Sequence, residues 1–474
     1  MSGAVSCRLP PVAGPVECDT GPPAMSDLLP ADTIAALATP TGTGAIALLR
    51  ISGPGAVGVA DAVFRGPSLV PRRAILGKIV SAEGDLIDGV LLTFFPGPAS
   101  YTGEDTIEIS CHGGVLVTRR VLDRLLAAGA RAAGPGEFTR RAFLNGKLDL
   151  TQAEAVMEVI TAQTDRALKA AHRQLEGVLG RTIVSLRDDL LGVLAHVEAF
   201  IDFPEEDIDP DTGANLKHRM EALQSRMEAL LKTADQGRLL REGVRTVLAG
   251  APNAGKSSLL NRFLGFDRAI VSELPGTTRD TIEEVISLQG FPLHLIDTAG
   301  LREEGADAIE AAGMARTKSQ LESADLILEV VDASQPPPAQ RVGIPEDSVN
   351  RHLLILHKSD LPSHPAWAGS GGVAVSSLTG EGMDSLTNRI FGIITAGGDG
   401  FEQAEVAVNA RHAECLQKAS GGLSHALQEL VSGSSAEFTA LELRLALESL
   451  GEIVGRVDTE DLLGVIFSQF CIGK

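Results

Sequence analysis

The segment Gly250-Ala251-Pro252-Asn253-Ala254-Gly255-Lys256-Ser257 decides the fold of the middle of this chain. It follows an apolar run of strand length, residues 244–249, and precedes a run with helical spacing, residues 258–264. In such a loop, glycines let backbone amides converge on phosphate oxygens. An ordinary glycine-rich turn before a helix is the alternative, and the strand-then-helix context disfavours it. The segment therefore predicts a P-loop in which Lys256 neutralises the β- and γ-phosphates and Ser257 ligates magnesium.

Two further motifs follow the P-loop in the order that a GTPase requires. The first, Gly276-Thr277-Thr278, can bring a threonine hydroxyl to magnesium when a γ-phosphate is present. The second, Asp297-Thr298-Ala299-Gly300, follows an apolar run of strand length about 40 residues after the P-loop. An Asp-x-x-Gly turn alone is common. At this spacing it predicts that Asp297 holds magnesium through water and that Gly300 offers its amide to the γ-phosphate.

The segment His357-Lys358-Ser359-Asp360 is predicted to select the base. The Asp360 carboxylate can accept hydrogen bonds from N1–H and the exocyclic N–H of guanine, a pair of donors that adenine does not offer. GTPases usually begin this motif with asparagine, so His357 is a departure. We expect its imidazole to donate one hydrogen bond but not to donate and accept as an amide does, which would weaken guanine binding by roughly 1 kcal/mol. Ser376-Ser377-Leu378 resembles the final loop, which backs the guanine.

The group that orients the attacking water is less clearly marked. No glutamine or arginine finger is evident in the segment after Gly300. Glu303, Glu304 and Glu310 are the candidates for this role. A solvated helix start is the alternative interpretation for each of them.

The P-loop block lies between segments of different composition. Residues 32–145 alternate short β-branched runs with Gly/Pro turns and helical stretches, which predicts a small α+β domain. Residues 150–199 and 214–240 show helical spacing, and so do residues 406–430 and 438–453. The α/β block is therefore predicted to be inserted into a helical domain whose two halves flank it.

The bulk composition excludes several classes of protein. Of the 474 residues, 44% are hydrophobic and 22% charged, which is typical of a globular rather than a disordered chain. No run approaches the ~18 apolar residues of a membrane helix. Five scattered cysteines fit free thiols in a reducing cytoplasm. A net charge of −21 argues against nonspecific coating of nucleic acid, so any RNA contact is expected on the nearly neutral first third.

The remaining motifs are distributed over the first third and the end of the chain. They are Asp32-Thr33-Ile34-Ala35-Ala36-Leu37-Ala38-Thr39-Pro40, Leu49-Arg50-Ile51-Ser52-Gly53, Tyr101-Thr102-Gly103-Glu104-Asp105, Cys111-His112-Gly113-Gly114, Pro135-Gly136-Glu137-Phe138-Thr139, Asn145-Gly146-Lys147-Leu148-Asp149 and Phe470-Cys471-Ile472-Gly473-Lys474. In this order they resemble the MnmE (TrmE) family of tRNA-modification GTPases. The resemblance runs from about residue 30 to residue 474.

The resemblance implies an α/β and α+β multidomain fold. Its parts would be a tetrahydrofolate-binding N-terminal α+β domain (25–146), a discontinuous helical domain (147–242 and 399–474), and an inserted Ras-like P-loop G domain (243–398). Residues 1–24 fall outside the resemblance and are expected to be a disordered extension, with translation starting at Met25.

The resemblance also implies a function. Together with an FAD-containing partner of the MnmG (GidA) type, the family adds a carboxymethylaminomethyl group to C5 of the wobble uridine in certain tRNAs. The one-carbon unit would come from 5,10-methylene- or formyl-tetrahydrofolate, and GTP hydrolysis would drive the cycle. The implied protein is a cytoplasmic homodimer that assembles with its partner and tRNA and not with a membrane.

Roles for single residues follow from the resemblance by position. The folate contacts would be Arg50, Glu108, Lys147 and Lys474; ordinary surface charges are the alternative. The metal ligands would be Ser257 and Thr278 for magnesium, and Asn253, Ser272, Leu274 (through its carbonyl) and Thr277 for potassium. The catalytic residues would be Glu310, Lys256 and Cys471, although a buried small apolar residue is the alternative for Cys471. The GTP contacts would be Asn253, Ala254, Gly255, Lys256, Ser257, Ser258, Ser272, Glu273, Leu274, Pro275, Gly276, Thr277, Thr278, Asp297, Thr298, Ala299, Gly300, His357, Lys358, Ser359, Asp360, Ser376, Ser377 and Leu378.

Two other functions remain open at this stage. A ribosome-assembly GTPase would share the P-loop with Asn253 but would not carry the first 145 residues. A folate-dependent aminomethyl transferase with a degenerate G domain would carry them but would not turn over GTP.

Overall fold

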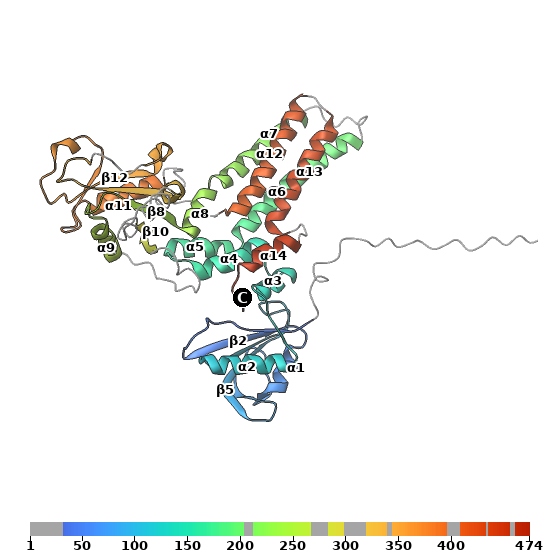
Figure 1. Cartoon of the computed structure of the whole chain (residues 1–474). Coiled ribbons are helices and arrows are strands. Elements are labelled where there is room, and N and C mark those ends of the chain that lie inside the picture. The colour runs from blue at the N-terminus through green and yellow to red at the C-terminus, as the bar shows by residue number, and fades with distance from the viewer. Residues whose placement is uncertain are drawn as a thin grey trace, which may run out of the picture. The chain divides into compact units, whose positions relative to one another are not determined.

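The computed structural model describes residues 32–202, 212–266, 283–297, 319–338, 344–395, 408–432, 435–455 and 460–474. The chain divides into two compact units, which can be followed by residue number in Figure 1. One unit comprises the described residues up to Leu148 together with Asp461–Lys474, and the other comprises Asp149–Glu460. The expectations for residues 1–24, 272–278, 298–300, Glu303, Glu304 and Glu310 concern positions outside the described residues.

The first unit is built on a seven-stranded sheet with the order β3-β4-β5-β6-β2-β1-β7. The strands are β1 (Ile34–Leu37), β2 (Ile46–Ser52), β3 (Phe64–Arg65), β4 (Ile75–Val80), β5 (Leu86–Phe95), β6 (Thr106–His112) and β7 (Arg131–Ala132). The helices are α1 (Ala56–Val63), α2 (Val115–Ala127) and α3 (Glu137–Leu144). Aliphatic side chains of the central strands pack with those of α1 and α2 in one core. The expected α+β domain is confirmed.

The register of this sheet sets the first candidate site. β2 pairs with β6 so that Arg50 lies opposite Glu108. The neighbouring Leu49 and Ile51 are fully buried in the core. Because successive side chains of a strand point to opposite faces, Arg50 and Glu108 share the face opposite α1 and α2.

The C-terminal segment belongs to this unit by its contacts. After α14 (Glu460–Ser468), Ile472 forms a bridge with Pro135, and the amide of Phe138 donates to the Lys474 backbone oxygen at 3.1 Å. Gly473 has a φ of +97°, and a Cβ there would lie 2.3 Å from the carbonyl oxygen of Leu37. Glycine is therefore needed where the tail passes over the end of β1. The family resemblance instead groups residues 399–474 with the helical domain, whereas by contacts Asp461–Lys474 belong to the first unit.

The helical part of the second unit combines two separate stretches of the chain. Its helices are α4 (Leu150–Thr161), α5 (Asp165–Leu175), α6 (Val178–Asp202), α7 (Thr212–Leu231), α8 (Ala234–Glu242), α12 (Ala410–Ser432) and α13 (Ala436–Val454). Figure 1 shows α6, α7, α12 and α13 as long helices lying side by side. One core joins them, with Leu190 of α6 beside Leu416 of α12 and Leu443 of α13. The expected discontinuous helical domain is confirmed.

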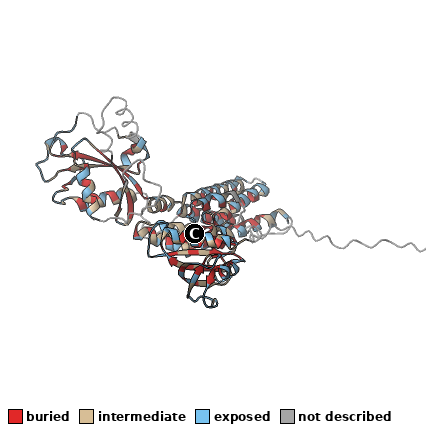
Figure 2. Cartoon of the chain, turned by 60° about the horizontal axis from the view of Figure 1, so that its bottom comes forward, coloured by how far each residue is buried: buried red, intermediate tan, exposed pale blue. Residues whose placement is uncertain are grey.

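An α/β block with a six-stranded sheet lies between these stretches in sequence. The strand order is β13-β12-β11-β8-β10-β9, parallel except for the β9–β10 hairpin. The elements are β8 (Val244–Ala249), α9 (Lys256–Phe266), β9 (Glu283–Leu288), β10 (Phe291–Asp297), β11 (Leu326–Asp332), η3 (Glu346–Arg351), β12 (His352–His357), η4 (Pro365–Trp367), β13 (Val373–Val375) and α11 (Met383–Thr395). The strands are largely buried (Figure 2). Parallel strands end at one edge of a sheet, so the carboxyl ends of β8, β10, β12 and β13 lie at that edge.

Candidate functional site

The loop between β8 and α9 has the backbone that its sequence predicts. Gly250 and Gly255 have φ values of +153° and +100°, and Asn253 has a φ of +61°. A Cβ at Gly250 would lie 2.2 Å from the carbonyl oxygen of Val330, and one at Gly255 would lie 2.1 Å from Nδ1 of His357. Both glycines are therefore required by close approach as well as by φ. The loop ends where α9 begins, so backbone amides at a helix N-terminus are available to an anion.

Lys256 is held inside this loop. Its ammonium donates to the carbonyl oxygens of Gly250 and Ala251, each at 3.0 Å, and the residue is 6% exposed. Asn253, Ser257 and Ser258 are exposed. The loop thus combines a fixed cation with oxygen-bearing side chains that remain accessible to a ligand, which suits phosphate and a hard metal ion.

The base-selecting segment follows β12 at the same edge of the sheet. Lys358 has a φ of +63°, and its ammonium donates to Asp332 at 2.6 Å. Burial opposes the charged form of Asp332, but hydrogen bonds from Lys358 and Ser334 outweigh it and lower the pKa of that carboxyl group. The ion pair ties the end of β12 to the end of β11.

Asp360 is exposed and is oriented by the next loop. The hydroxyl of Ser376 donates to Asp360 Oδ1 at 2.5 Å and accepts from the amides of Leu378 and Thr379, each at 3.2 Å. The amide of Ser359 donates to the carbonyl oxygen of Val375 at 3.2 Å. A carboxylate held in this way is placed to accept the two donors of a guanine edge.

His357 is buried, and both of its ring nitrogens have partners. Nδ1 lies 3.1 Å from the carbonyl oxygen of Ala254, and Nε2 lies 2.7 Å from the hydroxyl of Ser377. Burial is the main cause that lowers the pKa of His357. The imidazole was expected to donate one hydrogen bond and not to accept a second as an amide does. Its two nitrogens instead both have partners, in two different loops, and the predicted loss of guanine affinity stays a prediction.

The structure describes only some of the residues that are predicted to bind magnesium and potassium. Asp297 ends β10, and its Cα is paired with that of Leu248 in β8. Asn253 and Ser257 are described, whereas the other predicted ligands, Ser272, Leu274, Thr277 and Thr278, are not. Within the described ranges, no group of three or more His, Cys, Asp or Glu side chains is arranged to hold a metal ion.

The first unit brings Arg50 and Glu108 into direct contact. The Arg50 guanidinium donates to Glu108 Oε1 at 2.9 and 3.1 Å. Its carbon lies 5.2 Å from the ring centroid of Tyr101 and 5.6 Å from that of Phe138. The result is a half-buried ion pair framed by two aromatic rings.

The other two predicted folate residues, Lys147 and Lys474, bond to other segments of the same unit. Lys147 Nζ donates to the carbonyl oxygen of Pro98 at 3.1 Å, close to the segment that carries Tyr101. The Lys474 backbone oxygen accepts from the amide of Phe138, whose ring lies under Arg50. Cys471 is exposed, so its interpretation as a buried apolar residue is wrong.

Sequence reasoning missed the residues that hold this arrangement in place. Tyr101 and Phe138 belong to motifs of the family resemblance, but the sequence assigns them no role in a site. Arg141 is 1% exposed and pairs with Asp32 at 2.6 Å, Glu137 at 3.0 Å and Glu104 at 3.2 Å. These bonds fix α3, and with it Phe138, against the start of β1. A buried arginine has no signature in composition or spacing, so only the packing reveals it.

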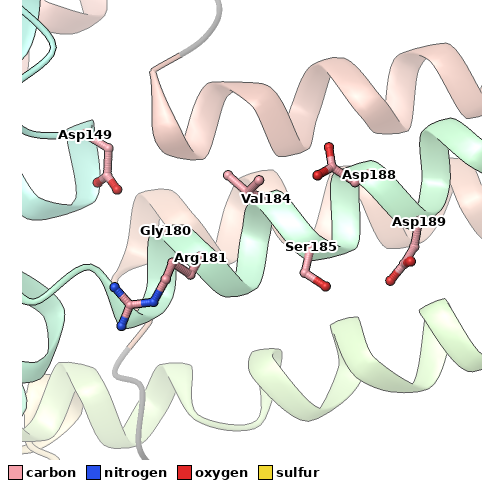
Figure 3. Close-up of a pocket in the computed structure, with 7 residues that line it drawn as sticks. All are labelled: Asp149, Gly180, Arg181, Val184, Ser185, Asp188 and Asp189. Atoms are coloured by element: carbon pink, nitrogen blue, oxygen red, sulfur yellow. The ribbon is translucent and has the colours of Figure 1, made fainter.

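A shallow pocket in the second unit is separate from the predicted residues. It has a volume of about 430 Å³ and lies along α6. Figure 3 shows its lining residues, which are Asp149, Gly180, Arg181, Val184, Ser185, Asp188 and Asp189. Asp149 caps α4, and Asp189 pairs with Arg226 at 2.6 Å. Two of its acids thus already have structural partners. None of the helices in the described residues is long and apolar enough to cross a membrane.

Comparisons with known proteins agree with the resemblance seen in the motifs. The family model described as MnmE helical domain matches residues 150–471, and the model described as GTP-binding protein TrmE N-terminus matches residues 33–147. The tRNA modification GTPase MnmE of Akkermansia muciniphila is 54% identical, covering 94% of this chain and 99% of that protein. The protein of the same name from Opitutus terrae is 47% identical over the same shares. Among solved structures, the G domain of the T. maritima FeoB iron transporter is 27% identical and covers 32% of this chain and 99% of its own, with a TM-score of 0.24. The chain belongs to the MnmE (TrmE) family of tRNA modification GTPases.

Proposed function

We propose that this chain hydrolyses GTP as part of a tRNA modification reaction. With an FAD-containing partner of the MnmG (GidA) type, it adds a carboxymethylaminomethyl group to C5 of the wobble uridine in certain tRNAs. A tetrahydrofolate one-carbon unit supplies the added carbon. The names and full-length similarity of its relatives support the tRNA role. The single observation that carries the GTP assignment is the placing of Asp360, oriented by Ser376, at the same sheet edge as the loop that holds Lys256.

Different residues of the α/β block supply the separate functions that GTP hydrolysis needs. Lys256 neutralises charge on the β- and γ-phosphates, and the amides at the start of α9 bind phosphate oxygens. Ser257, Thr278 and Asp297 hold magnesium, and Glu310 orients the attacking water. Asn253, with Ser272, Leu274 and Thr277, holds potassium. The exposed oxygen-bearing side chains of Asn253 and Ser257 fit these roles, because both ions prefer oxygen ligands.

The face of the first unit that carries Arg50 suits a folate. A carboxylate such as Glu108 can accept from the amino edge of a pterin, and cations such as Lys147 and Lys474 can pair with the glutamate tail. The rings of Tyr101 and Phe138 add flat apolar surface beside the Arg50–Glu108 pair. The exposed Cys471 lies within the tail that bonds to the same unit, where its backbone oxygen accepts from the amide of Gly136 at 3.4 Å. This position fits a thiol role near the one-carbon group.

Partner and assembly are parts of the same proposal. The family resemblance supports a cytoplasmic homodimer that works with the FAD-containing partner. Free thiols at Cys111 and Cys415, both buried, and at Cys471 fit a reducing compartment.

The decisive test is mass spectrometry of wobble uridines in tRNA from a strain that lacks this gene. The modified uridine should disappear and return with the wild-type gene. Lys256→Ala should fail to restore it and should abolish GTP turnover by the purified protein. Glu108→Ala should fail to restore it while GTP turnover stays intact. Unaltered wobble uridines in the deletion strain would contradict the tRNA role, and absent GTP turnover by the wild-type protein would contradict the GTPase role.

A further inference from the structure

His357 connects three loops that surround the candidate nucleotide site. It ends β12 and is the first residue of the base-selecting segment. Its Nδ1 reaches the P-loop at Ala254, and its Nε2 reaches the loop after β13 at Ser377. The ring also fills the space beside Gly255, where a Cβ would lie 2.1 Å from Nδ1. The imidazole is 3% exposed, so water does not compete for these bonds.

The partners of His357 fix its tautomer. The carbonyl oxygen of Ala254 can only accept, so Nδ1 must carry the hydrogen and donate it. In the neutral ring Nε2 is then a bare acceptor, and the Ser377 hydroxyl must donate to it. The lowered pKa of His357, caused first by burial, agrees with a neutral ring. Lys358 adds to this effect, and Asp332 and Asp360 oppose it.

The bonds of His357 extend to the residue that reads the base. Ser377 follows Ser376, which holds Asp360, and His357 lies three residues before Asp360. Two neighbouring serines of one loop therefore secure both ends of the base-selecting segment. His357 adds the link from this pair to the P-loop.

We propose that His357 is a positioning residue, which sets the P-loop against the guanine-reading loops by donating to Ala254 and accepting from Ser377. The proposal rests on the GTP binding proposed above. A link of this kind acts on both phosphate and base contacts at once, so it governs how long a nucleotide stays bound. It does not touch the reacting γ-phosphate. Loss of the link raises the dissociation rate and the KM for GTP and leaves kcat unimpaired.

The test measures release of mant-GDP from the full-length protein by stopped flow, and GTP turnover beside it. His357→Leu keeps the volume of the side chain but removes both bonds. Release should become about tenfold faster, the effect expected for two hydrogen bonds in a buried site. Ser377→Ala removes one bond and should speed release by about threefold. His357→Asn retains a donor for Ala254 and should restore release to within about threefold of the wild type.

The controls separate positioning from a loss of fold. His364→Leu makes the same chemical change at a residue that only caps η4, and release should be unaltered. A thermal melt shows whether each variant is folded; should His357→Leu not fold, Ser377→Ala and His357→Asn carry the test. Wild-type release rates for His357→Leu and Ser377→Ala would overturn the proposal, and so would a fall in kcat with unaltered release. Failure of the wild-type protein to bind mant-GDP would instead contradict the proposed GTP function.

Discussion

The Glu154 carboxylate lies 2.7 Å from the imidazole of His412, across the junction between the two halves of the helical domain. Glu154 belongs to α4 and the fully buried His412 to α12. Arg411 donates to the same carboxylate at 2.8 and 3.0 Å. His412 Nε2 makes no well-angled hydrogen bond, and burial lowers the pKa of His412. Arg411 is the permanent positive charge beside Glu154, and His412 adds a second one when its ring is protonated.

Replacing Glu154 by glutamine should strongly destabilise the second unit. The change keeps the side-chain shape but leaves the Arg411 charge without its carboxylate, which costs on the order of 3 kcal/mol for a buried pair. Chemical denaturation followed by circular dichroism measures the loss. Glu414→Gln is the matched control, because Glu414 pairs with Lys418 on the exposed surface of α12. That variant should leave the free energy of unfolding nearly unchanged, because an exposed ion pair contributes little. Equal effects of the two changes would contradict a stabilising role for the buried pair.

The contribution of Glu154 should vanish in acid. Burial opposes its charge, but His412 and Arg411 outweigh burial and lower the pKa of Glu154 to about 2, against an ordinary value of 4.5. A lowered pKa means that the unfolded chain takes up the proton first as the pH falls. The stabilisation is thus complete above pH 4.5 and is lost between pH 4.5 and about 2. Below pH 4.5 the difference in unfolding free energy between wild type and Glu154→Gln should therefore shrink as the pH falls. A difference that stays level in acid would show that charge is not the cause.

GTP turnover should be faster in potassium than in sodium. The sequence marks no arginine finger to neutralise charge between the β- and γ-phosphates, and the exposed side chain of Asn253 can hold a monovalent cation there. An advantage of about tenfold or more corresponds to ~1.4 kcal/mol of transition-state stabilisation.

Because Asn253 has a φ of +61°, replacing it by glycine tests its side chain more cleanly than replacing it by alanine. Glycine adopts a positive φ without strain, so Asn253→Gly removes the side chain and preserves the loop. This variant should still bind GDP and should turn over GTP equally in the two salts. Equal rates for the wild-type protein would show that no potassium site operates.

Deleting residues 472–474 should weaken folate binding and spare GTP hydrolysis. The tail bonds to Phe138, whose ring lies under Arg50, so its loss disturbs the candidate folate face. Isothermal titration with 5-formyltetrahydrofolate measures the affinity. Lys474→Ala separates the side chain from the backbone, because the bond from the Phe138 amide remains. If the deletion leaves the affinity unaltered, the tail is not part of the folate site.

The sequence by itself determined the features that depend on consecutive residues. Residues 250–257 have the backbone that their glycines predict, since φ values and the start of α9 are set locally. The alternation of strand-length and helix-length apolar patterns likewise predicts the wound parallel sheet. The helical spacing on either side of it predicts the two halves of the helical domain. The order of the motifs along the chain was sufficient to identify the family.

Only the tertiary structure decided which distant residues meet. Arg50 and Glu108 are 58 positions apart and face each other because of the register of β2 and β6. His357 and Ala254 are 103 positions apart and meet because β8 and β12 end at one edge of a parallel sheet. From the motif alone, His357 was expected to make a poorer bond than asparagine. Its two partners come from loops whose positions are fixed by strand order, and strand order depends on packing across the whole sheet rather than on the residues beside His357.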